Sequence, residues 1–185
     1  VNADCSNGGA AVFTPNTNTV TLRSSNGAID SGGDAFYNLT IPTTYSFTAN
    51  DALSVSNVLT VNGTLKIKTS LTVTTTFDNT NGTIEYNGTA IQNITAFTTY
   101  NNIVISNTSA TVSAGGNFTT NSITINNNVV FDGSGRTITV NNFWTNDGSF
   151  TANGSTVTFS GTPSTVAGNN ITQFANIVIP NTKSL

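Results

Sequence analysis

Apolar and polar residues alternate along most of the chain with a period of two. Val20 and Leu22 flank Thr21, for example, and the same alternation runs through 65–68 and 138–140. Because successive side chains of a strand point to opposite faces, this pattern predicts half-buried β-strands. No window shows the 3.6-residue period of an amphipathic helix, and the many Thr, Asn and Gly residues disfavour one. The sequence therefore predicts an all-β protein.

Three segments of the chain resemble one another, with cores at 13–41, 77–105 and 150–179. Each opens with an aromatic residue that is followed seven positions later by a β-branched residue. A second aromatic follows after a further 16 or 17 positions and leads into an Asn-containing apolar stretch. Repetition of this kind indicates a chain built from similar structural units. We therefore expect residues 1–185 to form a single repetitive β domain.

The alternation also predicts which side chains face the interior. Three polar residues should be exposed between the apolar ones, namely Thr21, Glu85 and Thr158. The residues expected to point inward are Val20, Leu22, Leu39, Ile41, Ile84, Tyr86, Ile103, Ile105, Val157, Phe159, Ile177 and Ile179.

Two architectures fit many short strands. In a parallel β-solenoid, or β-helix, each copy of 64 to 73 residues would form about three coils of 21 to 25 residues, and each coil would bury its inner side chains against its neighbours. In the alternative, the copies are tandem small antiparallel β-sandwiches that assemble by donated strands, with Asn-Gly pairs as hairpin turns. The solenoid is favoured, because sandwiches of about 65 residues would have marginal cores.

The composition argues against several classes of function. Asn, Thr and Ser supply 83 of the 185 residues, whereas charged residues make up only 7%. A net charge of −3 gives no basic surface for nucleic acid, whose binding requires clustered Lys and Arg. With no His, one Glu and one Cys, the chain lacks the usual materials for acid–base catalysis or a Cys/His metal site,. No apolar stretch reaches the length of a membrane span. We expect no enzyme activity, no cofactor and no bound metal.

The phrases FTANGSTVTFSGT and FANIVI resemble the Asn/Thr/Gly-rich repeats of secreted prokaryotic surface proteins. That resemblance implies a right-handed parallel β-helix and a structural role in an adhesin stalk, surface filament or sheath. It also implies an extracellular or cell-surface location, reached after removal of a signal peptide.

Several residues invite a more specific chemistry. Asp30 and Asp34 are the closest pair of carboxylates, but they are read as a solvated turn rather than a catalytic pair. The turns at Asp132 and Asp147 lack the repeated acids of a calcium loop. Trp144, the single Trp, is expected to fill the core or a coil end rather than to bind sugar,.

Nine Asn-x-Ser/Thr sequons are candidate N-glycosylation sites. Their number is about what this composition gives by chance, so it is not evidence of selection. The sequons begin at Asn38, Asn62, Asn81, Asn87, Asn93, Asn107, Asn117, Asn153 and Asn170.

The expected function is an extracellular structural protein that assembles head to tail with copies of itself. Residues 1–12 and 174–185 are the predicted contact segments, because a terminal solenoid coil exposes an unpaired strand edge and an apolar interior. A contact of that kind does not close on itself and builds a filament. The candidate assembly residues are Cys5, Phe174, Asn176, Ile177 and Ile179.

Two alternative functions stay open. One is a carbohydrate-binding or carbohydrate-cleaving β-helix module, with cell-surface glycans as partners. The other is an ice- or mineral-binding solenoid, which the Thr-x-Thr pairs would support, although Arg23 and Glu85 interrupt equivalent strands.

Overall fold

The computed structural model describes residues 5–6, 14 and 16–185, which form strands and loops without a helix. They build a parallel β-solenoid of about eight turns. The strands of the described residues pair in parallel, so the alternative of antiparallel sandwiches is wrong. The chain divides into two compact units, Val1–Glu85 and Tyr86–Leu185.

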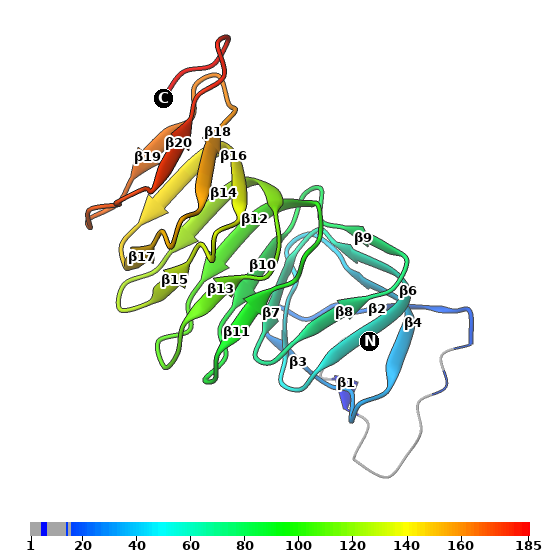
Figure 1. Cartoon of the computed structure of the whole chain (residues 1–185). Helices are drawn as coiled ribbons and strands as arrows, with labels where there is room; N and C mark the ends of the chain where they lie inside the picture. Colours follow the sequence, from blue (N-terminus) through cyan, green and yellow to red (C-terminus); the bar gives the residue numbers. More distant parts are fainter. Residues whose placement is uncertain (1–4, 7–13, 15) are drawn as a thin grey trace. The chain divides into compact units, whose positions relative to one another are not determined.

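The first unit contains two rows of parallel strands (Figure 1). One row runs β1 (Cys5–Ser6), β3 (Gly27–Asp30), β5 (Ser46–Ala49), β7 (Thr64–Ile67) and β10 (Thr83–Tyr86), whose last residue opens the second unit. The other row runs β2 (Thr19–Thr21), β4 (Ala35–Ile41), β6 (Leu53–Val61) and β8 (Leu71–Val73), with β9 (Thr76–Asp78) also paired to β6.

The second unit repeats this plan (Figure 1). Its longer row runs β12 (Thr99–Ile105), β14 (Phe118–Ile125), β16 (Thr137–Asn146), β18 (Thr156–Phe159) and β20 (Asn176–Val178), with β19 (Thr165–Ala167) also paired to β16. The shorter row runs β11 (Gln92–Ile94), β13 (Val112–Ala114), β15 (Val130–Asp132) and β17 (Ser149–Thr151).

The registers of the strand pairs give the length of a turn. Leu39 pairs with Leu59 in the first unit, and Phe143 pairs with Thr165 in the second. Hydrogen bonds between adjacent turns bridge sequence separations of 18 in the first unit and 22 in the second. The turns are therefore shorter on average than the sequence repeat suggested, because the loops between strands are brief.

The registers also explain the sequence repeat. Val20 pairs with Leu39 in the first copy, and Val157 pairs with Ile177 in the third. The two matching halves of these copies are therefore consecutive turns, stacked with their apolar residues in contact. Phe13, which opens the first copy, lies outside the described residues.

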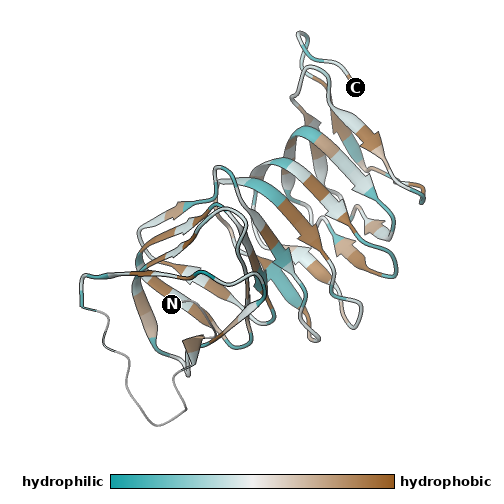
Figure 2. Ribbon diagram, turned by 180° about the vertical axis from the view of Figure 1, so that it is seen from behind, coloured by the Kyte–Doolittle hydropathy of each residue, from teal (hydrophilic) through white to brown (hydrophobic). Residues whose placement is uncertain are grey.

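The core prediction is largely confirmed. Nine of the twelve residues expected to point inward are buried, Val20 is half-buried, and only Ile177 and Ile179 are exposed. Figure 2 shows the same alternation as apolar segments along the strands. Thr21, Glu85 and Thr158 are half-buried rather than exposed, because outward-facing side chains of a parallel ladder contact their counterparts on neighbouring turns.

Candidate functional site

The outer edge of β20 has no neighbouring strand among the described residues, and apolar side chains are exposed beside it. β20 pairs with β18 on one side and ends its row of strands. Val157 on β18 is completely buried, whereas Ile177, its partner one turn later, is 48% exposed. The same alternation that fills the core thus continues into a turn that no other described residue covers.

Further apolar side chains accompany Ile177 on this terminal turn. Val178 and Ile179 are each 44% exposed, and Asn176 is also exposed. In β19, Val166 is open to solvent as well. We call β19, β20 and Ile179 the terminal edge. It combines unpaired backbone groups with exposed apolar side chains, a combination that favours the addition of another strand.

An aromatic cluster closes the interior near the terminal edge. It consists of Phe131, Trp144, Phe150, Phe159 and Phe174, which we call the aromatic plug. The ring centroids of Trp144 and Phe150 lie 4.8 Å apart, and those of Trp144 and Phe174 lie 5.2 Å apart, both edge to face. Trp144 is completely buried, so it fills the core as expected and offers no platform to a sugar.

The first unit ends its rows at β1 and β2. Cys5 lies in β1, which pairs with β3 and is the first strand of its row. Partial burial raises the pKa of the Cys5 thiol, which therefore stays protonated at neutral pH,. Of the predicted contact segment 1–12, only Cys5 and Ser6 lie within the described residues.

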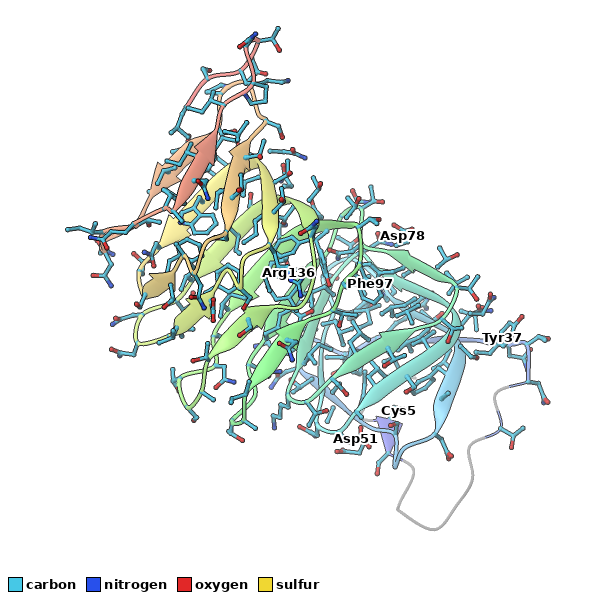
Figure 3. The ribbon with its side chains drawn as sticks, in the orientation of Figure 1. Cys5, Tyr37, Asp51, Asp78, Phe97 and Arg136 are labelled. Atoms are coloured by element: carbon cyan, nitrogen blue, oxygen red, sulfur yellow. The ribbon has the colours of Figure 1, made fainter. Side chains whose placement is uncertain are left out.

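Asp30 and Asp34, the closest pair of carboxylates in the sequence, are residues whose hydrogen bonds link neighbouring coils or close a turn. Asp30 accepts a hydrogen bond from Asn50 Nδ2 at 3.0 Å, and the backbone N–H of Asp34 donates to Ser31 O at 3.2 Å. Asp51, labelled in Figure 3, was not singled out from the sequence. Its carboxylate accepts hydrogen bonds from the backbone N–H groups of Ser31 and Gly32. Asp51 therefore fixes a turn that belongs to the neighbouring coil.

In the two turns considered as calcium loops, the Asp carboxylates accept hydrogen bonds from N–H groups of the protein. Asp132 accepts hydrogen bonds from Ser134 N at 2.7 Å and from Asn153 Nδ2 at 3.2 Å. Asp147 Oδ1 accepts from both the backbone and the side chain of Asn169. Within residues 5–6, 14 and 16–185, no group of three or more His, Cys, Asp or Glu side chains could hold a metal ion.

An ion pair joins neighbouring turns of the first unit. Lys66 Nζ lies 3.4 Å from Glu85 Oε2, and the two side chains are 31% and 18% exposed. Lys66 thus lies on the polar face of its strand, as the alternation predicts.

The sequons occupy very different environments. Five of the nine Asn residues are exposed, namely Asn81, Asn93, Asn117, Asn153 and Asn170. Asn38, Asn62 and Asn87 are half-buried.

Asn107 is the one buried sequon residue of the nine, at 1% exposure. Its Nδ2 donates to Ala90 O and to Gln92 Oε1, while its Oδ1 accepts from the backbone N–H groups of Ser109 and Ala110. The Asn107 side chain therefore organises a loop, and the atom that would carry a sugar is enclosed.

No known protein family, curated protein or solved structure matches the chain. The part of the chain that the structure describes contains no helix long and apolar enough to cross a membrane.

Proposed function

We propose that the protein is an extracellular structural solenoid, a subunit of a surface filament, sheath or stalk that lengthens by stacking turns at the terminal edge. The occupant of that edge is a second copy of this chain, so the assembly is head to tail. The low charge and the neutral Asn, Thr and Ser surface agree with the composition of secreted structural repeats.

The contrast between Val157 and Ile177 carries the proposal. These two residues are paired in register on consecutive turns, yet one is completely buried and the other is 48% exposed. Covering Ile177 and Ile179 with one more turn would bury them as Val157 and Phe159 are buried. Because both side chains are about half exposed, covering each would contribute to association about half of the roughly 1.5–3 kcal/mol of a full burial,.

The opposite end of the chain offers a compatible surface. β1 and β2 each begin a row of parallel strands in the first unit. A parallel strand edge can pair with the edge of β20 without a change of strand direction. Because the two surfaces differ, the contact is heterologous and repeats from one copy to the next.

Sedimentation velocity over a range of concentrations, combined with negative-stain electron microscopy, tests the proposal on the full chain. The unmodified protein should form species larger than a monomer, and these should grow with concentration. Ile177→Lys should remain monomeric, since a charge on the buried side of an added turn would lack a partner.

Val130→Lys is the matched control. Val130 is an apolar strand residue of the same unit and is 39% exposed, but it lies in β15, away from β20. This variant should assemble like the unmodified protein. A monomer at every concentration, or equal assembly of the Ile177→Lys and Val130→Lys variants, would refute the proposal.

A further inference from the structure

Threonine side chains line up from turn to turn on the outer face of the second unit. Their strands alternate these residues with Phe118, Ile138 and Val157, which are buried, so the threonines face outward. One column pairs Thr99, Thr119, Thr139 and Thr158 in register.

A second column lies two residues earlier on the same face. Thr137 pairs with Thr156, and Asn117 occupies the corresponding position on β14's N-terminal side. Neighbours within a column are about 4.8 Å apart, and the two columns are separated by about 6.7 Å, from the strand spacing and the rise per residue. The columns therefore form a regular grid of neutral hydrogen-bonding groups.

A shallow hollow lies in this grid. It has a volume of about 340 Å³ and is lined by Thr98, Asn117, Phe118, Thr119, Thr137 and Thr139. That volume is at the lower end of the roughly 300–1,000 Å³ typical of ligand sites. Every lining side chain is uncharged.

Fixed contacts hold the hollow in shape. Asn117 Oδ1 accepts a hydrogen bond from Thr137 N at 2.9 Å, which joins two adjacent turns. Thr119 N donates to Thr98 O at 2.9 Å. The ring of Phe118 packs edge to face against Tyr100, with centroids 5.8 Å apart. A ligand would therefore meet a site that loses little conformational entropy on binding.

Residues next to the lining in sequence add an aromatic ring and a single charge. Phe97 precedes Thr98 and packs against Tyr100 at 5.9 Å between centroids, and Arg136 precedes Thr137 and is exposed. Figure 3 labels both residues. No acidic residue belongs to the lining, whereas the outer face of the first unit carries the ion pair of Lys66 with Glu85.

We infer that this hollow is a binding site for a neutral oligosaccharide. A sugar hydroxyl both donates and accepts hydrogen bonds, and so does each Thr hydroxyl of the lining. Asn117 keeps its Nδ2 amide available as a donor, because the bond to Thr137 uses its Oδ1. Phe118 lines the floor of the hollow but is only 4% exposed, so the contacts to a sugar come from the Thr hydroxyls and the Asn117 amide. A cationic ligand would find no carboxylate in the lining, and an anionic ligand would find no cation there, since Arg136 only adjoins it in sequence; either ligand would lose hydration without compensation from the lining,.

Titration followed by NMR tests this inference on the full chain. The probes are the β-1,4-linked hexasaccharides of glucose, mannose and N-acetylglucosamine, with hexagalacturonate as the acidic comparison. At least one neutral hexasaccharide should shift the amide resonances of Asn117, Thr119 and Thr139. The double variant Thr119→Val/Thr139→Val keeps the shape of both side chains and removes both hydroxyls. It should bind that sugar at least about tenfold more weakly.

Thr40→Val/Thr60→Val is the matched control. Thr40 and Thr60 are also half-buried and paired on consecutive turns, but they lie in the first unit. This control should bind like the unmodified protein, and both double variants should keep the wild-type melting temperature within a few degrees. The inference is overturned if no neutral hexasaccharide binds, if hexagalacturonate binds more tightly, or if the two double variants bind equally well.

Discussion

Two separate Ile→Ala variants measure how completely a turn is covered by its neighbouring turns. Ile123 is completely buried and pairs in register with Trp144 on the next turn. Ile123→Ala removes well-packed methyl groups and leaves a cavity that the neighbouring turns cannot fill, so it should lower the free energy of unfolding by about 2–5 kcal/mol. Ile177 is 48% exposed, so Ile177→Ala loses only about half of a full burial term, below about 1.5 kcal/mol.

Urea unfolding monitored by tryptophan fluorescence and far-UV circular dichroism provides the measurement. Trp144 is the only tryptophan and is completely buried, so its emission reports on the second unit. With a urea dependence of about 2 kcal/mol per M, Ile123→Ala should lower the midpoint by about 1–2.5 M and Ile177→Ala by less than about 0.8 M. Equal shifts for the two variants in dilute solution would refute the reasoning, because Ile177 would then be covered in the isolated chain.

Three further outcomes follow from buried groups and tight turns. Burial raises the pKa of Tyr86 and raises that of Tyr100 further. The folded state therefore holds these two protons more tightly than the unfolded state does. The free energy of unfolding should be constant below the ordinary tyrosine pKa of 10.0 and fall as the pH rises above it,. Melting temperatures measured from neutral to strongly alkaline pH check this, and Tyr100→Phe should reduce the alkaline loss. Asn107→Ala should cost about 1–3 kcal/mol because it removes the hydrogen bonds that the buried Asn107 side chain makes to Gln92 and to the backbone of its loop,. Asn93→Ala at an exposed sequon should cost less than about 0.5 kcal/mol in the same urea assay. Similar costs would contradict the network described above. Gly148→Ala should lower the melting temperature by several degrees, since a Cβ there would meet two backbone carbonyl oxygens,; an unchanged melting temperature would show that the backbone yields at this position.

Alternation along the chain was enough to predict the all-β class and most of the core, whereas the solenoid was favoured because a sandwich of about 65 residues would have a marginal core. Ile84, Ile103 and Val157 are buried as expected because a period of two depends only on local strand geometry. The exposure of Ile177 could not be read from that period, since it depends on whether another turn covers the strand. Turn length was overestimated because loop lengths leave little mark on the apolar pattern.

The site residues depended even more on register. Thr119 and Thr139 are twenty positions apart, and nothing in the sequence shows that they are neighbours until the strands are aligned. Asp51 was missed for the same reason, because its partners Ser31 and Gly32 belong to the preceding coil. The predicted exposure of Thr158 failed because its neighbours on adjacent turns shield it.

The short turn has a mechanical consequence. Each turn of about 20 residues adds only about 4.8 Å along the stack, because its hydrogen bonds to the next turn run along the solenoid axis. A force applied along that axis would open those bonds one turn at a time, and each released turn would extend to roughly 65–70 Å of chain. Within each unit, then, every turn stores more than ten times its own thickness as releasable length, and a stretched unit would lengthen in steps before any covalent bond carries the load.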